Sequence, residues 1–223
     1  GVEVVVAEGT GCCGSLVHHM GREHQAAVQA KADIDAWTRE IEGRGLDAIM
    51  ITASGCGVTV KDYGFMFRTD PAYAEKAKRV SALARDVSEV LAEVLPDIQP
   101  GQSTEGAQAL RVAYHSACTL QHGQKLPGLA PGLLRKAGFT VLDIPETHIC
   151  CGSAGTYSML QPEMSEQLRD RKARNIESVQ PDVIASGNIG CITQIAQATG
   201  IPIVHTVELL DWAHGGPRPA QLG

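Results

Sequence analysis

One short segment occurs twice in this chain of 223 residues, and it constrains the fold more than any other feature. Cys12-Cys13-Gly14 and Cys150-Cys151-Gly152 each follow an apolar run. Further along, Ala53-Ser54-Gly55 recurs as Ala185-Ser186-Gly187. Self-similarity of this kind predicts two related structural units that repeat the same order of elements.

Short β-branched runs alternate with helical patterns along both units. This alternation is typical of α/β folds in which crossover helices join parallel strands. The expected strands are residues 3–7, 48–52, 112–114, 140–144, 183–185 and 203–204. One long helix is expected after Asp70 and Pro71, on an apolar stripe from Ala77 to Val94, and a second helix begins at Pro162. The predicted fold class is therefore two duplicated α/β units.

The repeat also predicts the domain boundaries. We expect a first unit at 1–95, a linker rich in Pro, Gly, Gln and Ser at 96–105, and a second unit at 106–223. The second unit has an additional strand that leads to Cys118, 32 positions before Cys150. The same interval before Cys12 falls outside the chain, so we expect the first unit to be truncated at its N-terminal side.

Composition restricts the class of protein. The net charge of -6 and the lack of a stripe rich in Lys and Arg argue against nucleic-acid binding. Every apolar run is far shorter than the roughly 20 residues that cross a bilayer. The odd count of seven cysteines favours metal or redox thiols in a reducing compartment. We expect a soluble, cytoplasmic protein without a transmembrane segment, which leaves peripheral membrane association open.

The cysteines are the candidate ligands. Adjacent cysteines form poor disulfides, because their Cα atoms lie about 3.8 Å apart while disulfides need roughly 4.4 to 6.8 Å. The second unit contains four thiols in three loops at strand ends: Cys118, Cys150, Cys151 and Cys191. Four thiolates suit zinc or an iron–sulfur cluster, and widely separated loops can surround more than one ion. The first unit contains three, which predicts an incomplete site: Cys12, Cys13 and Cys56.

Other interpretations of these segments remain open. The thiols can be buried apolar residues, the most common role of a free cysteine. Residues 9–14 also match the G-x-G-x-x-G dinucleotide pattern, with Asp33 about 20 positions on, but the equivalent segment 147–152 lacks the first two glycines. His115 and His148 lie close to cysteines and can donate hydrogen bonds to a cluster. A Cys118–His115 nucleophile has no oxyanion-hole signal to support it.

Five segments together resemble a known family. They cover residues 53–64, 114–124, 150–157, 187–191 and 205–212. A single cysteine, then Cys-Cys-Gly, then a Cys-x-x-Cys position is the pattern of the CCG cysteine-rich domain, which also occurs in heterodisulfide reductase B subunits. Within that family the chain most resembles the C-terminal half of the iron–sulfur subunits of glycolate oxidase.

The resemblance implies that the chain is part of an oxidoreductase complex and that this part is not catalytic by itself. It implies an iron–sulfur cluster, of the 4Fe–4S type, and flavin-containing partner subunits that oxidise glycolate, with zinc as the alternative in an aerobic preparation. CCG domains that hold a non-cubane cluster use five cysteines, whereas the second unit has four, with Asn188 at one Cys-x-x-Cys position. Related subunits serve lactate or glycerol-3-phosphate dehydrogenases, and a heterodisulfide-reductase-like thiol redox module is a further alternative.

Overall fold

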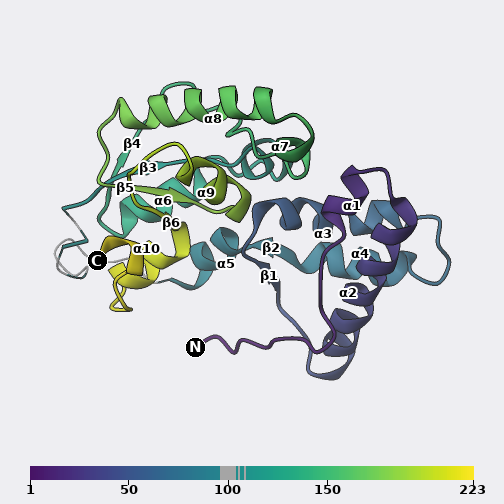
Figure 1. Ribbon diagram of the computed structural model, residues 1–223. Helices are drawn as coiled ribbons and strands as arrows, with labels where there is room; N and C mark the ends of the chain where they lie inside the picture. The colour runs from purple at the N-terminus through teal and green to yellow at the C-terminus, as the bar shows by residue number, and fades with distance from the viewer. Residues whose placement is uncertain (96–103, 105, 108) are drawn as a thin grey trace. The chain divides into compact units, whose positions relative to one another are not determined.

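The computed structural model describes residues 1–95, 104, 106–107 and 109–223, and the chain divides into two compact units, 1–94 and 95–223 (Figure 1). These ranges are close to the expected 1–95 and 106–223. Apart from residue 104, the predicted linker at 96–105 lies outside the described residues. The α/β fold class is confirmed, since parallel strands alternate with helices in both units.

The first unit consists of helices around a small parallel sheet. Its elements are α1 (Ser15–His19), α2 (Glu23–Gly43), β1 (Ile49–Ile51), α3 (Ser54–Met66), α4 (Ala74–Leu83), β2 (Ala84–Asp86) and α5 (Val87–Val94). Strands β1 and β2 pair in parallel. The core lies between α2, α3 and α4, where Ile34, Val60, Tyr63 and Val80 are buried.

The expected strand at 3–7 does not form. Val4 and Val6 are 71% and 89% exposed, and no strand is assigned before β1. β-branched residues favour extended backbone, but a strand also needs a neighbour to bond its N–H and C=O groups. Within the described residues this segment has no such neighbour.

The expected long helix after Asp70 is interrupted. Helix α4 ends at Leu83, and residues 84–86 pair with β1 before α5 begins. The Asp86 carboxylate accepts hydrogen bonds from the Ser88 N–H at 2.9 Å and the Ser88 hydroxyl at 2.6 Å, and Glu89 accepts from the Asp86 N–H at 2.8 Å. These contacts form a capping box that starts a new helix. Pairing with β1 therefore overrides a continuous helical pattern.

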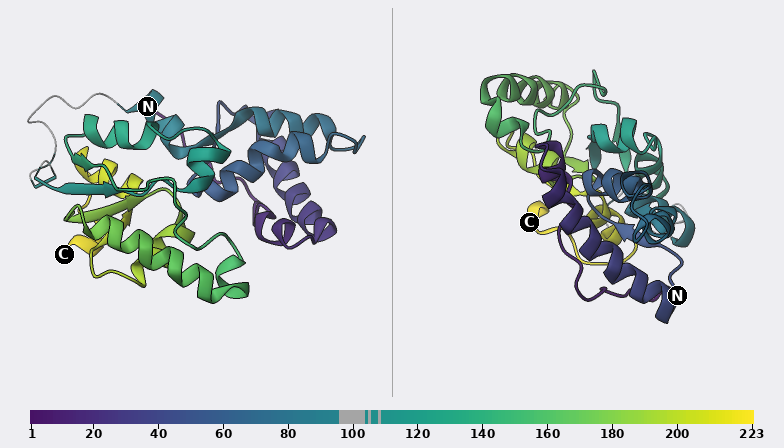
Figure 2. Two further views of the ribbon diagram at one scale, coloured as in Figure 1. Left: turned by 90° about the horizontal axis from the view of Figure 1, so that it is seen from above. Right: turned by 90° about the vertical axis from the view of Figure 1, so that its right-hand side faces the viewer.

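The second unit contains a four-stranded parallel sheet with strand order β4-β3-β5-β6. Its elements are β3 (Arg111–Tyr114), the π-helical turn η1 (Thr119–Gly123), α6 (Leu129–Lys136), β4 (Thr140–Leu142), α7 (Tyr157–Leu160), α8 (Pro162–Glu177), β5 (Val183–Ser186), α9 (Ile189–Ala196), β6 (Ile203–His205), α10 (Thr206–Ala213) and η2 (Ala220–Leu222). Helices α6 and α10 cover one face, and α8 and α9 the other (Figure 2).

The strand order creates a switch point. From β3 the chain moves to β4 on one side, and then returns to β5 on the other side of β3. The loops after β3 and β5 therefore diverge at the carboxyl edge, where open α/β sheets bind their ligands. In the described parts of the chain, no helix is both long and apolar enough to cross a membrane.

Candidate metal centre

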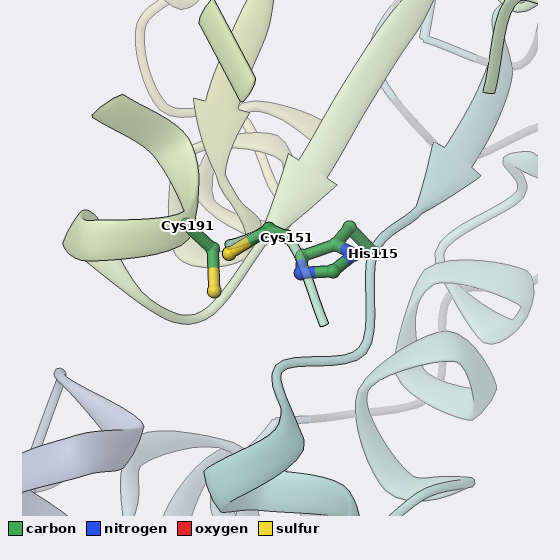
Figure 3. Close-up of side chains that lie close together, drawn as sticks. All are labelled: His115, Cys151 and Cys191. Carbon is green, nitrogen blue, oxygen red and sulfur yellow. The ribbon is translucent and has the colours of Figure 1, made fainter. Parts of the chain in front are cut away.

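Loops at the carboxyl edge of the second sheet bring thiols and an imidazole together. His115 follows β3, Cys151 follows β4, and Cys191 lies in the first turn of α9 after β5. Their side chains point toward one another (Figure 3). The two Sγ atoms and one ring nitrogen of His115 all lie within 4.8 Å of one another, and all three residues are buried.

Cys118 and Cys150 extend this group. Hydrogen bonds link the thiol of Cys150 to those of Cys118 and Cys151, and Cys151 is linked in turn to Cys191. The Gly152 N–H also points at the Cys150 Sγ, at 3.3 Å. The structure thus brings the four predicted ligands of the second unit into one continuous network, and their role as ligands stays a prediction.

Shared protons shift the pKa values of these thiols in opposite directions. A hydrogen bond from Cys151, with a smaller contribution from the nearby His115, lowers the pKa of Cys191 to about 5. The pKa of Cys150 is also lowered, chiefly by Cys118, while the pKa values of Cys118 and Cys151 are raised because they hold the shared protons. The thiolate is the metal-binding form, so the lowered pKa values of Cys150 and Cys191 favour metal binding at these two thiols.

Two further residues position Cys191. The Asn188 side chain caps α9 by accepting hydrogen bonds from the backbone N–H groups of Gly190 at 2.9 Å and Cys191 at 3.3 Å. Asn188 is thus a helix cap at the place where the family pattern has cysteine. Further along α9, Gln194 donates to the Ser165 hydroxyl of the neighbouring helix α8, and that hydroxyl donates to the Gly152 carbonyl. These bonds connect α9, α8 and the Cys-Cys-Gly turn.

The donor set fits a thiophilic metal group. Soft thiolate donors favour zinc and iron–sulfur clusters over hard cations such as magnesium. The Nε2 atom of His115 is buried without a hydrogen-bond partner among the described residues, and the residue is only 2% exposed. A buried, unpaired nitrogen beside thiols is costly unless a bound group accepts its hydrogen bond or its lone pair.

The first unit brings together fewer thiols. Cys13 is buried and hydrogen-bonds Cys56, which lowers the pKa of Cys56 to about 7, whereas Cys12 is exposed. The Tyr63 hydroxyl donates to the Cys13 carbonyl at 2.8 Å. Cys12 is close enough to act on Cys56 electrostatically. The three predicted ligands are therefore neighbours, with two in contact and the third facing solvent.

The structure does not favour the dinucleotide interpretation of residues 9–14. Asp33 is buried and accepts a hydrogen bond from the Gly11 N–H at 2.7 Å, and residues 9–14 do not follow a strand. The dinucleotide pattern thus lacks its structural context. His148 is exposed and outside the thiol network, unlike His115.

Sequence reasoning did not identify Lys172, which is fully buried on α8. The available signal was its place four residues before Ile176 on the apolar face of that helix.

Comparison with known proteins agrees with the geometry. The profile of the CCG family, described as "Cysteine-rich domain", matches residues 1–61 and 112–196, which include all seven cysteines. The chain is 42% identical to the glycolate oxidase iron-sulfur subunit of Escherichia coli, over 96% of this chain and 51% of that protein. It is 30% identical to lactate utilization protein A of Bacillus licheniformis, over 95% of this chain and 87% of that protein.

A third relative is a probable glycolate oxidase iron-sulfur subunit of Bacillus subtilis. It is 30% identical over 87% of this chain and 43% of the relative. The chain thus spans about half the length, or less, of the two glycolate oxidase subunits, and most of the length of the lactate utilization protein.

Proposed function

The chain belongs to the CCG cysteine-rich domain family, and from that premise we propose that it is an iron–sulfur electron-transfer part of an oxidoreductase. The observation that carries the proposal is the thiol network at the switch point of the second sheet. Its four members are the proposed ligands: Cys118, Cys150, Cys151 and Cys191. Four thiolates match the requirement of a 4Fe–4S cluster.

The chain's own residues would tune this site. A thiolate-bound iron–sulfur cluster supplies one-electron transfer, with a potential set by charge, hydrogen bonds and burial. Cys151 and Cys191 are 2% and 6% exposed, so these two thiols are shielded from water. His115 is placed to donate a hydrogen bond to sulfur, and the Gly152 N–H already does so. In the first unit, Cys12, Cys13 and Cys56 are proposed as a weaker, incomplete site.

The finer proposal concerns the complex. The 42% identity to a glycolate oxidase subunit supports a role beside flavin-containing partner subunits that oxidise glycolate, with electrons passing through this chain to an acceptor. Lactate is the second candidate substrate, because the chain covers 87% of a lactate utilization protein. In both cases the substrate reacts on a partner, and the cytoplasm remains the expected location.

Metal and sulfide analysis tests the proposal. We expect the anaerobically purified chain to be brown and to contain iron and acid-labile sulfide. Cys151→Ala should lose most of the iron, because Cys151 is the link between Cys150 and Cys191. The control is Ser178→Ala, at an exposed position of the same unit, which should keep its iron. A colourless parent protein with one zinc ion and no sulfide would contradict the proposal and favour a structural zinc site.

A further inference from the structure

The Cys-Cys-Gly turns of both units are packed against a long helix in the same way. A Cβ atom on Gly14 would lie 2.9 Å from the Ala26 carbonyl oxygen of α2, and one on Gly152 would lie 2.3 Å from the Ser165 carbonyl oxygen of α8. Ala26 and Ser165 therefore mark equivalent points on the two helices. Residues seven positions later lie on the same face, two turns along.

Those equivalent positions carry opposite charges. Seven residues after Ala26 is Asp33, which is 1% exposed, and seven residues after Ser165 is Lys172, which is 0% exposed. Each binds the main chain just before the cysteine pair. The Asp33 carboxylate accepts from the Gly11 N–H at 2.7 Å, and the Lys172 ammonium donates to the Glu146 carbonyl at 2.9 Å.

Lys172 lies near the second-unit thiols. Burial lowers the pKa of its ammonium, and electrostatic interactions with Cys151, Cys150, Glu146 and Cys191 oppose that shift. The carboxylate of Glu146 is bound by Arg171 and Asn175 instead. A buried ammonium needs a countercharge, and the second-unit thiols, together with the Glu146 carboxylate, are placed to provide it. In the first unit, the Asp33 carboxylate instead acts to raise the pKa values of Cys13 and Cys56 through its negative charge.

We propose that Lys172 is a positioning residue whose buried positive charge stabilises the reduced form of the cluster held by the second-unit thiols. The inference rests on the proposed function and goes beyond it by naming the residue that sets the potential. Reduction transfers one electron from the reductant to the cluster, whose net charge becomes more negative by one while no bond breaks. A nearby cation favours that state. The first unit, with Asp33 at the equivalent position, lacks this effect.

The test is a redox titration of the reconstituted chain with dithionite, followed by electron paramagnetic resonance. Lys172→Met removes the charge at similar length, and Lys172→Gln removes it but keeps an N–H donor. Both should lower the equilibrium constant for reduction at least tenfold, which is about 59 mV for one electron. Lys172→Arg keeps the charge and should stay close to the parent protein. Lys78→Gln, at an exposed lysine of the first unit, removes the same net charge and should change nothing.

Cobalt binding by the metal-free protein provides a second measurement for any variant that does not assemble the cluster. The tetrathiolate complex is anionic, so Lys172→Gln should bind Co²⁺ at least tenfold more weakly, and Lys172→Arg should not. The inference would be wrong, with the proposed function untouched, if Lys172→Met and Lys172→Gln kept the parent's reduction equilibrium and cobalt affinity. It would also be wrong if Lys172→Arg lowered them as much as Lys172→Gln. A parent protein that binds neither cluster nor cobalt at these thiols would overturn the proposed function as well.

Discussion

Neighbouring residues, as much as the cysteines themselves, make the second-unit thiols suitable ligands. Cys191 receives a hydrogen bond from Cys151 and lies beside His115, and Asn188 holds its backbone at the start of α9. In the Cys-Cys-Gly turn, Gly152 has a φ of 88°, which glycine adopts without strain. Substitutions beside the cysteines should therefore disturb the site as much as loss of a thiol.

Gly152→Ala should destabilise the chain by about 2 kcal/mol or more, because the positive φ and the 2.3 Å approach to the Ser165 carbonyl both exclude a methyl group. Denaturant unfolding of the metal-free protein measures this. Gly200→Ala is the matched control, since nothing lies within 4 Å of its Cβ position. Equal stability of the two variants would show that the packing of α8 on the turn tolerates a side chain.

The contact of Glu146 with α8, which holds the segment before Cys150, should depend on pH. Hydrogen bonds from Arg171, and then Asn175, lower the pKa of Glu146 to about 2. The stabilising effect of this carboxylate is present above its ordinary pKa of 4.5 and is lost as pH falls toward 2. Arg171→Met should raise the pKa of Glu146 toward 4.5, as measured by NMR titration of its carboxyl carbon. Arg174→Met, at an exposed position of the same helix, should leave it unchanged.

Among the elements, backbone pairing decided where local patterns were ambiguous. Residues 77–94 read as one amphipathic helix, yet 84–86 form β2, because β1 offers a parallel partner for them. The valines before Ala7 favour a strand, yet no described segment of the chain pairs with them. Asp86 with Glu89 was the sequence signal for the new helix start, since an acidic residue followed three positions later by Glu is typical of a capping box.

A Val→Thr substitution should have different effects in segment 3–7 and in strand β3. Val112→Thr places a hydroxyl in the buried centre of β3 and should cost about 2 kcal/mol of unfolding free energy. Val6→Thr should change it by less than about 0.5 kcal/mol, since Val6 is exposed. Urea denaturation followed by circular dichroism measures both. A large loss in Val6→Thr would mean that residues 3–7 are paired in solution.

At the scale of the whole molecule, the two units offer different sites. The second has four parallel strands, a switch point and four linked thiols, whereas the first has two paired strands and three thiols, one of them exposed. Both units belong to the same family and both have the Cys-Cys-Gly turn. This difference places the proposed electron-transfer site in the second unit.

Electron flow in the complete complex tests that assignment. The isolated chain should oxidise neither glycolate nor lactate, because in the proposed function the substrate reacts on a flavin-containing partner subunit. In the full complex, Cys150→Ala should stop electron transfer to a dye acceptor by disrupting the cluster, while substrate still reduces the flavin. Stopped-flow absorbance follows the first step, and dye reduction follows the second. Normal dye reduction in this variant would instead indicate a structural role for the site.

The sequence alone determined the α/β class, the parallel strands and the candidate thiols. Hydrophobic periodicity is a local property, and a repeated segment identifies equivalent positions whatever their surroundings. Cys118, Cys150, Cys151 and Cys191 were therefore recognisable as a set, because each follows a strand and parallel strands share one carboxyl edge.

Tertiary structure decided which neighbours those thiols have. The burial of Lys172 and Asp33, the approach of His115 to Cys151 and Cys191, and the exposure of Cys12 depend on how helices pack on each sheet. The same packing decided that residues 84–86 became a strand and 3–7 did not. Charge burial and strand pairing involve partners far apart in the chain, so neither can be read from a local pattern.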